Sequence, residues 1–150
     1  MTHHENDEKD EFDLRNFLPF LLNQAAEESA LEFQRVYKNR YGLLRTEWRV
    51  LFHLGNYGEL TAKDIGLQAK THKTKISRAV HKLEQRRYLK RERDERDRRV
   101  ERLTLTPAGQ TVYRELRSFA EEYDARLTAK FTMGEAALLR MMLRRLAGME

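Results

Sequence analysis

The sequence predicts a mainly α-helical fold with one small β-hairpin wing, an α+β arrangement in which long helices flank a compact module. Apolar residues recur at helical spacing over most of the 150 residues, and the alternation typical of strands is confined to residues 89–105. Only 7 Gly and 2 Pro are present, and 35% of the residues are charged, which suits long helices with ionic outer faces. The length is that of one domain, so residues 1–150 are treated as a single-domain chain.

The composition excludes several classes of function. The sequence has no Cys, which excludes disulfides, thiolate metal sites and thiol nucleophiles. Its N-terminus is acidic where a signal peptide is basic, and no apolar run approaches the roughly 20 residues that cross a bilayer, so we expect a cytoplasmic protein without a membrane partner. No Gly-rich phosphate loop, His-Glu-x-x-His motif or nucleophile with an evident base indicates an enzyme. The isolated His53, His72 and His81 lack metal-ligand spacing, so we expect neither a metal nor a cofactor.

The positive charge is concentrated in one part of the chain. The whole sequence has a formal net charge of +5, but residues 70–102 hold 14 Lys and Arg against 6 acids and so carry +8, which leaves −3 on the rest. A charge run most often marks a solvated face, and a solubility surface is the simplest interpretation. A basic segment that coincides with a recognition motif would instead indicate a polyanionic partner.

Two helices are predicted before residue 60. An apolar stripe begins at Leu14 and lasts until Gly42, and Pro19 within it marks either a kink or the true first turn. At 1.5 Å per residue this helix is roughly 40 Å long, more than one small domain can cover, so it needs a partner surface. Thr46 opens a second helix, which the turn Gly55-Asn56-Tyr57-Gly58 is expected to close.

The next stretch has the pattern of a helix-turn-helix. Thr61 and Asp64 form an N-terminal capping signature, and a short helix is predicted from there to about Ala69. After a polar turn, an amphipathic helix is predicted from Lys73 to Arg87. The two faces of this helix are an apolar one, Ile76, Ala79, Val80 and Leu83, and a basic, hydrogen-bonding one, Lys73, Thr74, Lys75, Ser77, Arg78, His81 and Lys82.

A hairpin is predicted after this motif. Residues alternate in character from Leu89, and the run Asp94–Arg99 is wholly ionic. Apolar residues return at Val100, Leu103 and Leu105. We interpret this pattern as two strands that flank a charged tip, although the usual Asn-Gly turn signal is missing.

Two further helices complete the chain. Thr106-Pro107 starts one that runs to about residue 131, and a capping box at Thr132–Glu135 opens the last. The helices at 14–42 and 107–148 have too little core of their own, so we expect them to form an intersubunit bundle. Residues 46–105, which hold the helix-turn-helix pattern and the hairpin, are then expected to form a DNA-binding lobe.

Four segments carry a resemblance to a known family. In order and spacing, Thr46–Leu51, Thr61–Leu83, Asp94–Arg99 and Leu103–Gly109 resemble the MarR family of bacterial transcriptional regulators, and the resemblance extends over residues 17–146. It implies a winged helix-turn-helix on a homodimer whose first and last two helices form the interface. It also implies a pseudo-palindromic operator in double-stranded DNA, usually repression, and often release by a small-molecule effector.

The sequence departs from this family at Arg87, where many members have Gly after the recognition helix. If Arg87 adopts a left-handed conformation, it does so at a cost of roughly 1 kcal/mol. Alternatively the helix ends differently, which would change the angle of the wing.

The predicted DNA contacts fall into three groups. Arg and Lys pair with guanine edges, so the major groove is expected to be read by Lys73, Thr74, Lys75, Ser77, Arg78 and His81. Contacts to phosphates, which set the register, are expected from Thr61, Gln68 and Lys82. At the wing, Asp97 and Arg99 match the family's Asp-x-Arg pattern, which implies that Arg enters the minor groove and Asp orients it, while Arg96 and Arg98 compete for the same role. The simpler interpretations are a solvated helix face and an ion pair between Asp97 and Arg99 that only stiffens the tip.

An effector site is less defined by the sequence. Trp48 and Phe52 are predicted to pack in the core, with the floor of an effector cleft as the alternative for either. Phe20 and His53 are added to the candidate cleft because ligands usually sit there in the family. A second class of function remains open, in which the chain is a helical dimeric scaffold that binds a protein partner without sequence-specific DNA recognition.

Overall fold

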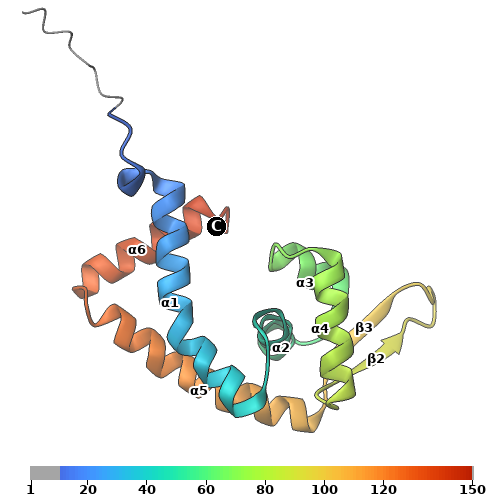
Figure 1. Cartoon of the computed structure of the whole chain (residues 1–150). Coiled ribbons are helices and arrows are strands. Elements are labelled where there is room, and N and C mark those ends of the chain that lie inside the picture. Colours follow the sequence, from blue (N-terminus) through green and yellow to red (C-terminus); the bar gives the residue numbers. More distant parts are fainter. Residues whose placement is uncertain (1–10, 150) are drawn as a thin grey trace, which may run out of the picture. The chain divides into compact units, whose positions relative to one another are not determined.

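A computed structural model describes residues 11–149 and confirms the mainly helical fold with a small antiparallel sheet (Figure 1). Residues up to Glu32 and those from Phe33 onward form two compact units, and each is described by itself. Within the described residues, no helix combines the length and the apolar character needed to cross a membrane. The elements are η1 (Leu14–Asn16), α1 (Leu18–Tyr41), α2 (Arg45–Tyr57), β1 (Leu60–Thr61), α3 (Ala62–Gln68), α4 (Lys73–Gln85), β2 (Leu89–Arg93), β3 (Glu101–Leu105), α5 (Pro107–Thr128) and α6 (Met133–Leu146).

The first predicted helix starts later than expected. Residues 14–16 form the short 3-10 helix η1, and α1 begins at Leu18, so Pro19 lies in its first turn. Proline is tolerated there because the first amides of a helix have no partner within it. Of the two roles considered for Pro19, the structure therefore supports the first turn.

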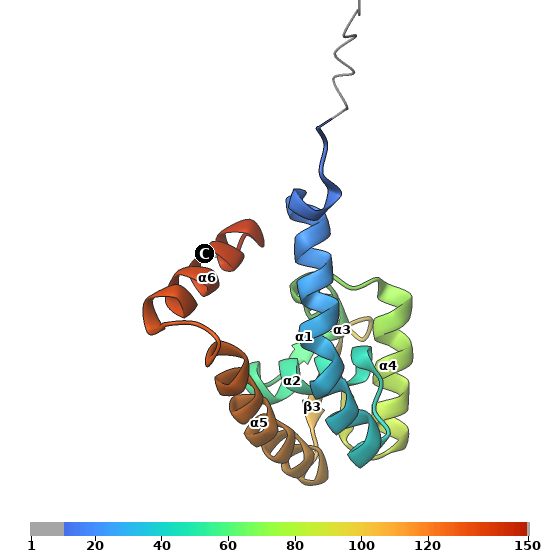
Figure 2. The same ribbon diagram turned by 60° about the vertical axis from the view of Figure 1, so that its left-hand side comes forward.

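A cluster of aromatic side chains packs against the mainly aliphatic core of residues 33–149. Phe33 on α1 contacts Trp48 on α2 edge to face, with the ring centroids 5.5 Å apart, and Trp48 meets Phe52 in the same way at 5.2 Å. Phe52 in turn lies 5.2 Å from the ring of Tyr113 on α5. Trp48 and Phe52 are half-buried against this core, which confirms the prediction that they pack there. Helix α5 packs against α2, and the two helices lie close to each other in both views (Figures 1 and 2).

The second helix is longer than predicted at both ends. It begins at Arg45 instead of Thr46, because the carboxylate of Glu47 accepts the Leu44 amide at 2.8 Å. It also continues through Gly55 and ends at Tyr57, just before Gly58, whose φ is 81°. Gly55 lies against Tyr113, where a Cβ atom would come within 2.4 Å of the ring. The glycine therefore serves close helix packing, and the expected turn at this position was wrong.

The predicted hairpin is confirmed, and the sheet has a third strand that the sequence did not indicate. The strand order is β1-β3-β2 with both pairings antiparallel, and Leu60 and Leu103 face each other across the first pair. Leu89 and Leu103 are buried and join the sheet to the helical core. Strand β1 has two residues, too few to show alternation.

The last two helices differ in how much they bury. Helix α5 buries Val112, Tyr113 and Leu116, so the first half of its apolar stripe belongs to the chain's own core and is not available for dimerisation. Helix α6 buries none of its residues and exposes Leu138, Met142 and Leu146 among others. Only the later part of this C-terminal region therefore retains the unburied surface that the sequence predicted.

We predict that Gly109→Ala destabilises the fold by about 2 kcal/mol or more, because a Cβ atom at this position would stand 1.9 Å from the Tyr88 carbonyl oxygen, a backbone atom that cannot rotate away. Urea denaturation measures the change. Gly134→Ala is the matched control: nothing lies within 4 Å of its Cβ position, so its stability should match or slightly exceed that of the parent. Equal midpoints for the two variants would contradict the packing argument.

Candidate nucleic-acid interface

The helix-turn-helix begins with the predicted capping box. The Thr61 hydroxyl accepts the Asp64 amide at 3.1 Å, and the Asp64 carboxylate accepts the Thr61 amide at 3.2 Å. Helix α3 ends where Lys70 adopts a positive φ of 50° and the Thr71 amide donates to the Gly66 carbonyl at 3.0 Å. This left-handed residue makes the turn toward α4 tight, and the two helices are then joined by buried side chains.

Helix α4 has two sharply different faces. Its buried residues are Ile76, Ala79, Val80 and Leu83, as predicted. Its N-terminus is capped by His72, whose Nδ1 accepts the Thr74 amide at 3.2 Å. The side chains predicted for the major groove, together with Lys82, are all exposed and share one helix: Lys73, Thr74, Lys75, Ser77, Arg78, His81 and Lys82. Of the other predicted phosphate contacts, Gln68 is exposed on α3, whereas Thr61 is half-buried and its hydroxyl caps the helix.

The C-terminus of α4 resolves the question of Arg87. This residue has a φ of 61°, the left-handed conformation that favours glycine. The Tyr88 amide donates to the Leu83 carbonyl and the Arg87 amide to the Glu84 carbonyl, both at 2.9 Å. These two bonds define a Schellman ending, so the helix ends as it would with Gly and the alternative ending is wrong. The guanidinium of Arg86 adds bonds to the carbonyls of Tyr41 and Gly42 at the end of α1.

The wing is an ordered loop between β2 and β3, and in Figure 1 it projects beyond α4. The Asp94 amide donates to the Val100 carbonyl at 2.9 Å, which closes the loop. Within it, the Asp97 carboxylate accepts both the amide and the Nε of Arg99, at 3.1 and 3.2 Å. The Asp97–Arg99 ion pair is therefore present, and it is the contact that both interpretations of the tip require. Arg96 and Arg98 are exposed beside it.

A set of ion pairs at the base of the wing was missed by sequence reasoning. The Arg102 guanidinium donates to Asp94 at 3.1 Å and to Glu59 at 3.3 Å. Arg91 joins Glu84 on α4 to Glu101 on β3, each at 3.2 Å. The Arg96 amide and then the Arg102 guanidinium hold the pKa of the Asp94 carboxyl below its usual value, because both stabilise the ionised form. These partners come from separate segments, so only the strand register reveals them.

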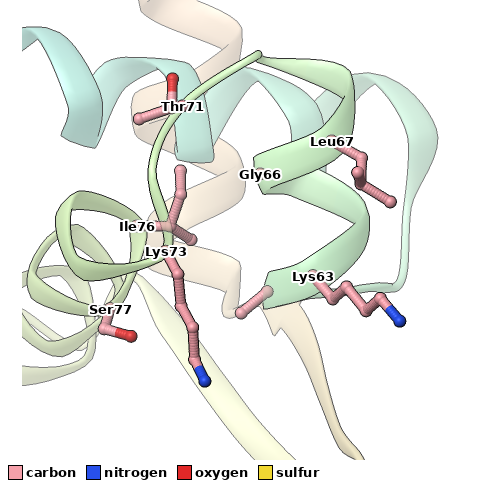
Figure 3. A pocket seen from close by; sticks show the side chains of 8 residues that line it. Lys63, Gly66, Leu67, Thr71, Lys73, Ile76 and Ser77 are labelled. Carbon is pink, nitrogen blue, oxygen red and sulfur yellow. The ribbon is translucent and has the colours of Figure 1, made fainter.

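A hollow of about 550 Å³ lies between α3 and α4 (Figure 3). Ala62, Leu67 and Ile76 give it apolar walls, while Lys63 and Lys73 contribute cationic side chains. Lys63 was not among the predicted DNA contacts. Its place in the first turn of α3, two residues beyond the Thr61 cap, is the sequence signal that would have included it.

The residues predicted for an effector cleft occupy two units of the chain. Trp48, Phe52 and His53 lie on α2 and are half-buried, whereas the half-buried Phe20 belongs to the N-terminal unit. His53 donates from Nδ1 to the Arg49 carbonyl at 2.6 Å. Neither the hollow between α3 and α4 nor a second one of about 420 Å³ at α1 and α5 is lined by any of these four residues.

A helix-turn-helix with an exposed basic second helix, followed by an arginine-tipped hairpin, defines a winged helix protein of the DNA-binding type. Residues 41–100, which cover the helix-turn-helix and the wing up to the start of β3, match the family model described as the MarR family. This match confirms the resemblance to the MarR family of transcription regulators that the sequence indicated.

Solved structures share the fold over nearly the whole chain. The MarR/EmrR family transcriptional regulator from Acinetobacter sp. ADP1 is 26% identical, with a TM-score of 0.82 and coverage of 91% of this chain and 96% of its own. NadR in complex with 4-hydroxyphenylacetate is 25% identical, with a TM-score of 0.77 and coverage of 89% and 94%. The S. aureus MepR–DNA complex, at 17% identity, a TM-score of 0.78 and coverage of 88% and 96%, is similar in fold alone. Comparison with curated proteins gave no match.

We predict that Arg87→Gly raises the free energy of unfolding by up to about 1 kcal/mol, since it removes left-handed strain of about 1–2 kcal/mol and adds a smaller entropic cost for glycine. Arg87→Ala removes the same charged side chain but keeps the strain, so it should give no gain. Denaturant midpoints of the two variants distinguish backbone strain from charge repulsion. A gain of equal size in Arg87→Ala would assign the effect to charge.

Proposed function

We propose that the chain is a homodimeric repressor that binds a pseudo-palindromic operator in double-stranded DNA and is released by a small-molecule effector in the cytoplasm. The observation that carries the proposal is the pairing of an exposed basic helix face with an ordered, arginine-tipped wing in one 33–149 unit. A charged surface that only improves solubility does not need a backbone fixed by hydrogen bonds. Here hydrogen bonds fix the start of α4, the end of α4 and the wing loop, as expected where side chains must meet a ligand in register.

The exposed face of α4 is assigned to the major groove. A recognition helix presents its N-terminal residues to base edges, which here are Lys73, Thr74, Lys75, Ser77 and Arg78, with His81 one turn further on. Lys and Arg provide the pairing with guanine that gives the largest discrimination. Thr61, Gln68 and Lys82 are assigned to phosphates. The capped, buried underside of the helix supports this assignment because it leaves the basic side free for DNA.

The wing is assigned to the minor groove. Arg99 is almost fully exposed, and Asp97 holds both its amide and its guanidinium. A narrow A·T-rich minor groove concentrates negative potential, which attracts an arginine presented in this way. Arg96 and Arg98 are exposed in the same loop and compete with Arg99 for this role.

Dimerisation is supported by apolar side chains that the chain does not cover. In α6 these are Leu138, Met141, Met142, Leu143 and Leu146. In the separate N-terminal unit they are Phe12, Leu14, Phe17, Leu18, Leu21 and Leu31. Exposed apolar surface of this extent marks an interaction site, and a two-fold dimer would pair two recognition helices with the two halves of a pseudo-palindrome.

Release by an effector is supported by the NadR complex with 4-hydroxyphenylacetate, a relative of the same fold with a small aromatic acid bound. In this chain we assign the effector contacts to Trp48, Phe52 and His53 on α2. An effector weakens operator binding only if it binds better to a conformation with low DNA affinity. The half-buried aromatic side chains on α2 provide the apolar contact that such a ligand needs.

The proposal is tested by selection from a pool of random duplexes. We expect an inverted repeat to be enriched and the selected duplex to bind two chains. If the dimer makes about 6–10 phosphate contacts, affinity should fall by about 10³-fold or more between 50 and 200 mM salt while the sequence preference persists. The competing function, a dimeric scaffold for a protein partner, predicts no enriched sequence. That outcome would overturn the regulator proposal for this interface.

Arg99→Ala should weaken binding to the selected duplex by about tenfold or more, because an arginine in a groove contributes about 1–3 kcal/mol. The matched control is Arg15→Ala. Arg15 is 89% exposed and pairs with Asp13 two residues before it, as Arg99, 92% exposed, pairs with Asp97. Both variants lose one exposed charge, so titrations followed by fluorescence anisotropy separate position from net charge. Similar affinities for the two variants would remove Arg99 from the minor groove.

A further inference from the structure

One arginine at the base of the wing connects segments that are far apart along the chain. Arg102 lies on β3, the central strand, and its guanidinium reaches Asp94 at 3.1 Å and Glu59 at 3.3 Å. Asp94 follows the last residue of β2 and starts the wing loop, while Glu59 precedes β1. The side chain therefore ties the wing loop to the opposite edge of the sheet.

Asp94 transmits this restraint into the loop. Its carboxylate accepts the Arg96 amide at 2.9 Å, and its own amide donates to the Val100 carbonyl at 2.9 Å. One residue thus fixes the first turn of the loop and closes its two ends. Bonds from the Arg96 amide and Arg102 lower the pKa of Asp94, because both stabilise its ionised form.

We propose that Arg102 and Glu59 are positioning residues, which act through Asp94 to hold the wing in the orientation that places Arg99 in the minor groove. This inference rests on the proposed function. A loop that is already held in one conformation loses little conformational entropy when it binds DNA. Its affinity is therefore higher than that of a flexible loop with the same arginines. The contacts of Arg102 place two acids, Asp94 and Glu59, close to the proposed DNA polyanion. By charge alone, these acids would weaken DNA binding through repulsion.

That repulsion makes the sign of one substitution decisive. Glu59→Gln removes a negative charge without changing the size of the side chain. If Glu59 acts only through its charge, the variant binds DNA more tightly. If Glu59 braces Arg102, the variant binds about two- to fivefold more weakly, the range expected for the loss of one exposed ion pair.

The experiment compares Glu59→Gln, Asp94→Asn and Glu95→Gln in anisotropy titrations with the duplex selected above. Asp94→Asn keeps an oxygen that can accept the Arg96 amide but loses the ion pair with Arg102, so it should also weaken binding. Glu95→Gln is the matched control, because Glu95 is an exposed acid in the same loop outside the Arg102 contacts. Its loss should leave affinity unchanged or raise it. Unfolding midpoints verify that the three variants are equally folded.

A double-mutant cycle separates positioning from general stability. If Glu59 acts through the wing, Arg99→Ala should cost less affinity in the Glu59→Gln background than in the parent, because the arginine is already less well placed. Equal costs in the two backgrounds, or tighter binding by Glu59→Gln, would overturn the inference while leaving the regulator proposal intact. Absence of any preferred duplex for the parent chain would overturn both.

Discussion

A single backbone contact joins α4, the wing and the long helix α5. Gly109, in the first turn of α5, lies so close to the Tyr88 carbonyl that no side chain fits between them. Around it, the Thr106 amide donates to Tyr88 at 3.0 Å and the Thr106 hydroxyl donates to the Arg87 carbonyl at 2.6 Å. The end of α4, the start of β2 and the start of α5 therefore meet at one point. The position of α4 and the wing relative to α5 depends on this junction.

Much of the fold could be predicted because it follows from local signals. The hydroxyl caps at Thr61, Thr106 and Thr132 each accept an amide three residues on, and each marks the start of a helix where the sequence placed one. What failed was decided by contacts between distant residues. In the sequence Gly55 resembles a helix stop, but it lies inside α2. There its lack of a side chain leaves room for the ring of Tyr113, 58 positions later.

The candidate site divides in the same way. The exposed face of α4 could be predicted from helical spacing alone, since burial of Ile76, Val80 and Leu83 leaves the basic residues outside. The wing arginines were visible as an ionic run. The Arg102 contacts were not, because its partners Asp94 and Glu59 are set by the register of β3 between its two neighbours. The residues assigned to an effector cleft rest on family resemblance and aromatic character, neither of which specifies a cavity.

The histidine cap of α4 determines which hydrogen-bonding group this end of the helix offers to a ligand. His72 accepts the Thr74 amide through Nδ1, so a neutral ring carries its proton on Nε2. Nδ1 is therefore occupied by the cap, and Nε2 is the ring nitrogen that this end of α4 presents to its surroundings, since His72 is exposed. A substitution of His72 would remove the helix cap and this exposed nitrogen together.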